Sequence, residues 1–289
     1  MTALPELPTT AAARPAGRRT RDRRWPLTVA ETVSAAILLV IVVAAVAPGL
    51  LAPRDPLAIA PADAFSAPSL AHPFGTDDSG RDLWSRVVHG ASASLLIGLA
   101  ATAIGTALGV VLGVAAGVGR RATDAAVSRL LEVLFALPGL LLALVIIAFT
   151  GPGPVPATLA VGLATAPGYA RIVRTQVRRV RSSEMVEAAR VLGRSPWSVL
   201  TRHVLPNALA PVLVLATLGV GQAVVWASSL SYLGLGSPPP APEWGAMLEA
   251  GRTYLAVAWW MTVFPGLAIV LTAAATTVLG RRLSRRGRA

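Results

Sequence analysis

The stretch VLFALPGLLLALVIIAFTGPGPVPATLAVGLATAPGYA, residues 133–170, runs for 38 residues without a charged side chain. A helix needs about 20 apolar residues to cross the roughly 30 Å of hydrocarbon in a membrane. The run GPGPVP at residues 151–156 interrupts the stretch, because glycine and proline favour turns. We therefore expect two membrane-spanning helices, at residues 129–149 and 157–173, joined by a tight turn.

Four more apolar windows flank this hairpin. We expect them to span the membrane at residues 28–47, 90–118, 208–230 and 258–280. Helices are the expected form because unpaired backbone groups are costly in lipid. The chain is 54% hydrophobic and 14% charged, whereas an average soluble domain has about 25% charged residues. The sequence thus predicts an all-α polytopic membrane protein with six spans.

Arginine placement predicts the orientation of these spans. All 26 basic residues are arginine, and the formal net charge is +12. Loops rich in basic residues stay in the cytoplasm, and 22 of the 26 arginines fall in segments that lie inside if the amino terminus is inside. Both termini are then cytoplasmic, residues 1–26 form a basic disordered tail, and residues 27–289 form the membrane domain. Residues 48–88 become an extracytoplasmic loop and residues 182–207 a cytoplasmic one. Topology explains the basic surplus, so we expect no nucleic-acid partner.

The cytoplasmic loop at residues 182–207 has the pattern of two short helices with a sharp break. Ser183 is placed to cap the first helix, and Gly193 suits a left-handed exit from it. Ser195 and Pro196 are typical of the start of a second helix. We expect a rigid elbow with a small alanine face, a shape suited to a groove on a partner protein.

Four segments of the chain resemble a known family. Glu187-Ala188-Ala189, followed by Gly193 and then by Leu205-Pro206, resembles the EAA loop of binding-protein-dependent ABC importers. The other three resemble the C-type permease of the dipeptide, oligopeptide and nickel branch. They are HPFGTDDSGRD at residues 72–82, SYLGLG at 231–236 with WGAML at 244–248, and FPGLAIVL at 264–271.

The resemblance implies a type I ABC importer transmembrane domain in the cytoplasmic membrane of a prokaryote. It implies as partners a homologous second permease subunit, two cytoplasmic ABC ATPase subunits, an extracytoplasmic solute-binding protein and the lipid membrane. Peptides are the expected cargo, with nickel or other metal chelates and other small solutes left open. The residues that it implies for coupling to the ATPases are Glu187, Ala188, Ala189, Gly193, His203, Leu205, Pro206 and Asn207. A loop helix lying on the lipid surface is the alternative for this segment.

The chain lacks the residues that nucleotide hydrolysis requires. A Walker A loop needs a lysine to reach the β- and γ-phosphates, and the sequence has no lysine. We therefore expect no enzyme activity, no catalytic residue and no cofactor bound by this chain, with ATP and Mg²⁺ held by the partner ATPase subunits. The alternative driving force is an ion gradient. A secondary transporter of that kind keeps ionisable residues at the middle of the membrane, and none falls there.

Two further patterns concern packing. Gly105, Gly109, Gly113 and Gly117 recur every four residues and form one stripe on the second span, which predicts a close helix contact. The stripe can face a helix of the same chain or the partner permease, and a direct lining of the solute path is a third reading. Prolines in or beside the spans predict kinks that can act as hinges; they are Pro138, Pro167, Pro211 and Pro265.

The outer loop carries an acidic cluster of Asp77, Asp78 and Asp82. It can be a metal or peptide-amine site. The favoured interpretation is a capping box between Ser79 and Asp82, with Asp77 and Asp78 exposed ahead of it. The three histidines, His72, His89 and His203, fall on different loops, so we expect no metal site.

Overall fold

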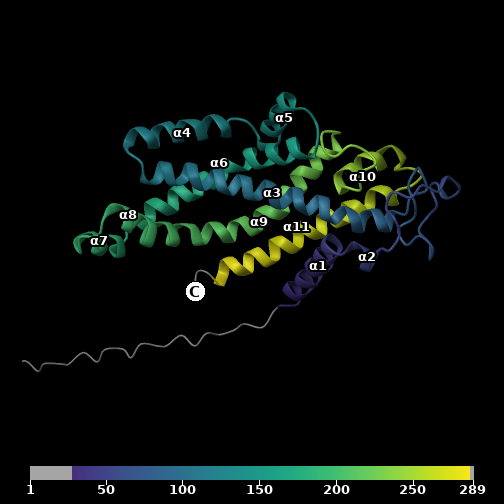
Figure 1. Cartoon of the computed structure of the whole chain (residues 1–289), viewed down its shortest axis with the longest axis horizontal. Helices are drawn as coiled ribbons and strands as arrows, with labels where there is room; N and C mark the ends of the chain where they lie inside the picture. Colours follow the sequence, from purple (N-terminus) through teal and green to yellow (C-terminus); the bar gives the residue numbers. More distant parts are fainter. Residues whose placement is uncertain (1–27, 287–289) are drawn as a thin grey trace, which may run out of the picture.

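The computed structural model describes residues 28–286, and the expected tail at residues 1–26 lies outside that range. The described part of the chain is helical and contains no β-strand. Figure 1 shows long helices running side by side, with α7 and α8 at one end of the long axis and α10 at the other. The α-helices are α1 Val29–Val46, α2 Pro48–Leu51, α3 Leu83–Val118, α4 Arg121–Phe135, α5 Gly139–Thr150, α6 Pro154–Arg181, α7 Glu184–Val191, α8 Pro196–Val199, α9 Leu205–Tyr232, α10 Trp244–Gly251 and α11 Trp260–Arg286. The shorter turns are η1 Pro61–Asp63, the π-helical η2 Leu200–Val204 and η3 Arg252–Tyr254.

Within residues 28–286, four helices are long and apolar enough to cross a membrane. They are Val29–Val46, Leu83–Val118, Pro196–Tyr232 and Trp260–Ser284. A fifth is counted if α4 and α5 form one broken span, since the two meet at a bend of 91°. The span expected at residues 129–149 is therefore divided between two helices, and the bend between them agrees with the kink predicted at Pro138. The break falls at Pro138, whose ring disfavours helical backbone in the residue before it.

The glycine stripe of α3 lies against α6 of the same chain. A Cβ atom added to any of the four glycines would come within 2.3–2.6 Å of α6 atoms, closer than real Cβ contacts. The nearest atoms belong to Thr165, Tyr169, Ala170, Val173 and Val177. The backbones of α3 and α6 can approach this closely because glycine has no side chain. The sequence left three arrangements open for the stripe, and the structure shows the contact with a helix of the same chain.

The segment between α1 and α3, here called the outer loop after the position that the sequence predicts for it, is bonded to the ends of the long helices through indole and guanidinium donors. The Nε1 of Trp260 donates to the carbonyl of Thr76 at 3.0 Å, and that of Trp84 to the carbonyl of Leu51 at 3.0 Å. Arg86 donates to the carbonyls of Pro56 and Pro240, both at 3.2 Å. The loop ahead of α3 is thereby tied to the loop ahead of α10.

The acidic cluster is arranged differently from the expectation. The N-cap of α3 is Asp82, whose Oδ2 accepts from the backbone N–H of Ser85 at 2.9 Å, so the capping box starting at Ser79 is wrong. Asp77 is 4% exposed and its carboxylate lies 3.5 Å from Nε of Arg86. The expectation that Asp77 is exposed is also wrong, because a buried arginine nearby compensates its charge. Asp78 is exposed as expected.

Candidate functional site

The elbow, residues 182–207, begins where α6 ends. Ser183 occupies the N-cap position of α7, but its hydroxyl donates to the carbonyl of Val180 at 2.7 Å and makes no cap bond. The expected side-chain cap is therefore wrong, because the Ser183 hydroxyl bonds a carbonyl in the last turn of α6 instead. Gly193 has φ +74°, the left-handed conformation that ends many helices. Its neighbour Arg194 donates its backbone N–H to the carbonyl of Ala189 at 3.2 Å, which closes the turn.

The second arm of the elbow is the start of a long helix. Ser195 accepts from the backbone N–H of Ser198 at 3.3 Å and begins α8. Helices α8, η2 and α9 follow without a break from Pro196 to Tyr232. The side-chain amide of Asn207, in the first turn of α9, donates to the carbonyl of His203, in the π-helical turn, at 2.7 Å. A force on the elbow therefore acts directly on α9.

Apolar side chains on the inner side of the elbow hold it to the bundle. Ala189 is 6% exposed and packs in a cluster with residues from α6, α7, α8, η2 and α9. The buried members of the cluster are Val173, Val177, Val186, Ala189, Val199, Val204, Ala208 and Val212. Ala189 thus faces inward, whereas the sequence predicted an outward face that included it. Successive helical residues differ by about 100° in direction, so Ala188 and Ala189 cannot share a face.

The outer side of the elbow combines carboxylates with exposed apolar groups. Glu187 and Ala188 are exposed. Beyond them Val191 is 83%, Leu192 80% and Trp197 72% exposed. We call the surface of Glu184, Glu187, Ala188, Val191, Leu192 and Trp197 the elbow surface. Exposed apolar patches of this kind, with an aromatic group and polar neighbours, are typical of binding surfaces for another protein.

Sequence reasoning missed the three large apolar residues of the elbow surface. Val191 and Leu192 stand directly before Gly193, and Trp197 follows Pro196. The signal was available in Trp197 itself. A short, arginine-rich loop cannot bury a side chain as large as that of tryptophan. Leu205 is half-buried at the start of α9, and Pro206 and Asn207 are exposed beside it. These three residues form the joint between the elbow and α9, behind the elbow surface.

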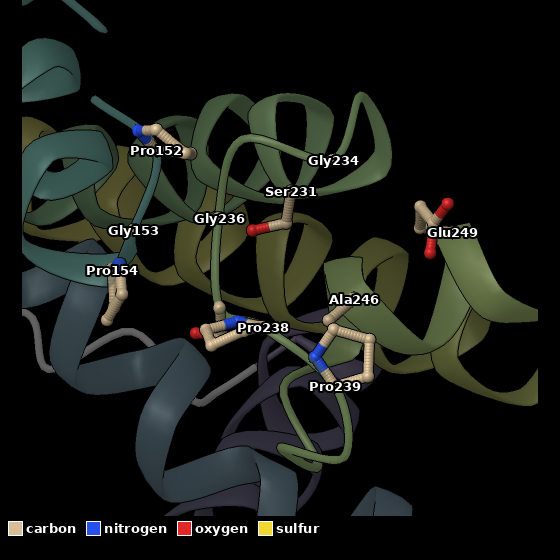
Figure 2. Close-up of a pocket in the computed structure, with 11 residues that line it drawn as sticks. Pro152, Gly153, Pro154, Ser231, Gly234, Gly236, Pro238, Pro239, Ala246 and Glu249 are labelled. Carbon is tan, nitrogen blue, oxygen red and sulfur yellow. The ribbon is translucent and has the colours of Figure 1, made fainter.

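A cavity of about 410 Å³ lies at the end of the molecule opposite the elbow. Figure 2 shows it between the turn ahead of α6, the loop after α9, and α10. Its lining is mainly proline and glycine, with Ser231, Ser237 and Glu249 as the polar residues. Glu249 lies 3.3 Å from Arg252, so its charge is compensated. The described residues hold no group of three or more histidine, cysteine, aspartate or glutamate side chains that could bind a metal ion.

The sequence of the chain also matches known proteins. Residues 109–289 match the model of the family described as "Binding-protein-dependent transport system inner membrane component". The chain is 43% identical over 253 residues to the glutathione transport system permease protein GsiD of Shigella flexneri, covering 87% of this chain and 83% of that protein. It is 37% identical over 220 residues to the dipeptide transport system permease protein DppC of Alkalihalophilus pseudofirmus, covering 76% and 72%.

Solved structures share the fold. A chain of the MetNI methionine ABC transporter in an inward-facing conformation aligns with a TM-score of 0.56 at 22% identity, covering 70% of this chain and 95% of that one. A chain of an amino acid ABC transporter aligns with a TM-score of 0.56 at 15% identity, covering 70% and 94%. The chain therefore shares its fold with subunits of these two ABC transporters.

Proposed function

This chain belongs to the family of binding-protein-dependent transport system inner membrane components, and on that basis we propose that it is the permease subunit of an ATP-driven importer for peptides. The observation that carries the mechanism is the elbow surface, which sits at the tip of an arm continuous with α9. An elbow surface that bound an ATPase subunit would connect nucleotide-driven movement to the membrane helices.

The membrane topology that we propose has six spans with both termini in the cytoplasm. Helices α1, α3, α9 and α11 supply four spans, the bent pair α4–α5 a fifth, and α6 a sixth. The apolar half of α6 precedes Arg171, and its arginine-rich half leads to the elbow. Glu31 of α1 pairs with Arg282 of α11, so the start of α1 and the last turns of α11 lie on the same side of the bundle. The placement of 22 of the 26 arginines supports a cytoplasmic position for that side.

The driving force comes from partner chains in this proposal. The sequence has no lysine for a Walker A loop, so two ATPase subunits bind ATP and Mg²⁺, and this chain binds neither. A second permease subunit completes the path, and a solute-binding protein delivers cargo at the outer end. Membership of this family argues against an ion-gradient-driven carrier.

Peptides are the proposed cargo because the names of the relatives include dipeptide and glutathione transport systems. Nickel or other metal chelates are the second candidate within the same permease class. Ligand extracted from the co-purified solute-binding protein and identified by mass spectrometry decides between them, and a chelated metal in place of a peptide would overturn the peptide assignment.

The elbow is tested by substituting Ala188→Trp in the assembled importer reconstituted in liposomes. Ala188 is exposed on the elbow surface, so the added indole obstructs a close-fitting partner without disturbing the core. We expect ATP-driven uptake to fall at least tenfold, while the amount of folded permease stays the same. The matched control is Ala103→Trp, also at an exposed alanine but on α3, which should transport like the wild type. Unchanged uptake by the Ala188→Trp importer would show that the elbow surface does not carry the coupling.

A further inference from the structure

The last turns of α6 hold three other segments together. Val177 is fully buried in the apolar cluster on the inner side of the elbow. Arg181 donates to the carbonyl of Gly117 at 2.6 Å and so fixes the end of α3. The third segment is α4, whose side chains meet the arginines of α6. Movement of the elbow therefore acts directly on α6 as well as on α9, and α6 has defined contacts through which to pass it on.

Asp124 makes the charged contact between α4 and α6. One of its carboxylate oxygens, Oδ1, lies 2.7 Å from both Nε and an Nη of Arg174, and Oδ2 lies 2.5 Å from Arg178. The Asp124 side chain is 22% exposed, so water screens these pairs less than pairs on an open surface. Arg174 and Arg178 are one helical turn apart and would repel each other without it.

The other end of α4 is also attached to α6. The guanidinium of Arg171 lies 4.1 Å from the ring centre of Phe135, the last residue of α4. Immediately beyond it the chain turns by 91° into α5. Gly139 starts α5 against the indole of Trp226 in α9, where an added Cβ would come within 2.3 Å of the ring. Helix α4 thus connects the elbow end of α6 to the bend ahead of α5.

We propose that Asp124 is a positioning residue that transmits movement of the elbow to α4 and, across the bend at Pro138, to α5. The inference rests on the proposed function, because it assumes that a partner ATPase moves the elbow. Asp124 is suited to this task since two arginines of α6 hold both of its oxygens. The second acid of α4, Glu132, is exposed and, among residues 28–286, pairs with Arg129 of its own helix. A rigid link of this kind lets two segments move as one body.

The test is Asp124→Asn in the reconstituted importer, read as solute taken up per ATP hydrolysed. The amide keeps the size of the side chain and removes the charge. Coupling between two sites is typically worth a factor of 5 to 150, and we expect the transport ratio to fall about tenfold, with the yield of assembled complex unchanged. Glu132→Gln is the matched control on the same helix and should keep the wild-type ratio.

Exchanging the two charges distinguishes a loss of transmission between α6 and α4 from a loss of stability of the permease. Asp124→Arg places three arginines together and should lower the ratio further, whereas Asp124→Arg combined with Arg174→Asp restores opposite charges and should recover most of it. If the single variants fail to assemble, Arg178→Gln removes one of the two pairs and is read in the same way. An unchanged ratio in the Asp124→Asn or Arg178→Gln importer would overturn the inference. Wild-type liposomes that show no ATP-driven uptake would instead overturn the proposed function.

Discussion

Single residues decide how closely the helices of this bundle approach. The clearest case is the contact between α3 and α6, where Gly109 faces Tyr169 so closely that an added Cβ would lie 2.3 Å from the tyrosine Cβ. The direction in which a side chain points matters equally in the elbow, where Ala188 is exposed and its neighbour Ala189 is buried. Substitutions at adjacent positions therefore test different things.

Gly109→Ala should destabilise the permease by overpacking the contact between α3 and α6. Inserting a methyl group into a well-packed site costs about 1–3 kcal/mol, and the measurement is the thermal unfolding midpoint of the purified protein in detergent. Gly168→Ala is the matched control within α6, because nothing lies within 4 Å of a Cβ added there. We expect Gly168→Ala to leave the midpoint unchanged or raise it slightly, since alanine favours helix more than glycine does. Equal midpoints for the two variants would contradict the packing account.

At the scale of elements, the boundaries of the helices set what each one can transmit. Helix α3 has 36 residues, about 54 Å at 1.5 Å per residue, and so extends beyond the hydrocarbon of a membrane. Its start at Leu83 depends on Asp82, which also lies 2.9 Å from Nδ1 of His72 in the outer loop. The outer loop and α3 are thus joined at one carboxylate.

The start of α3 should lose stability in acid. Burial raises the pKa of Asp82, but hydrogen bonds from Ser85 and His72 outweigh it and hold that pKa below its ordinary value. A carboxyl whose pKa is lowered in the folded state stabilises the fold above its unfolded pKa, and the stabilisation is lost as the pH falls through the folded pKa. We therefore expect the thermal midpoint to decline below about pH 4, near the ordinary pKa of an aspartate.

The Asp82→Asn variant identifies the group responsible for this pH dependence. It should flatten the dependence of the thermal midpoint on pH, because the titrating carboxyl is gone. Asp78→Asn, at an exposed aspartate of the same loop, should keep the wild-type profile. A profile unaltered by Asp82→Asn would assign the acid sensitivity to another group.

Taken as a whole, the molecule separates its two working ends along the long axis. The elbow lies at one end, and the tied outer loop with the 410 Å³ cavity lies at the other (Figure 1). Three continuous helices, α3, α6 and α9, connect the ends, and α6 and α9 enter the elbow directly. Helices α6 and α9 thus give the elbow two continuous connections to the opposite end of the molecule.

The purified chain should hydrolyse no ATP and move no solute when reconstituted alone. The physical reason is the absence of lysine, which leaves no side chain to hold the nucleotide phosphates as a Walker A loop does. The measurement is phosphate release and labelled-peptide uptake in liposomes, with the complete assembly as the positive control. Turnover above that of empty liposomes would contradict the assignment of the ATPase to partner chains.

The sequence by itself determined that the chain is helical, enters the membrane, belongs to an importer family and bends at Gly193. Each of these rests on short-range properties, such as the length of a charge-free window or the freedom of one glycine, which neighbouring residues decide. The sequence also predicted the tight turn between α5 and α6, because a run of glycine and proline cannot continue a helix.

Only the tertiary structure decided which way the residues face and what they meet. It placed the glycine stripe on α6, buried Asp77 beside Arg86, turned Ala189 inward and brought Asp124 to Arg174, 50 residues away. These outcomes depend on where distant segments pack, and local preferences carry no information about that. A carboxylate in an arginine-rich segment has many candidate partners in sequence, and the packing of α4 on α6 selects two of them.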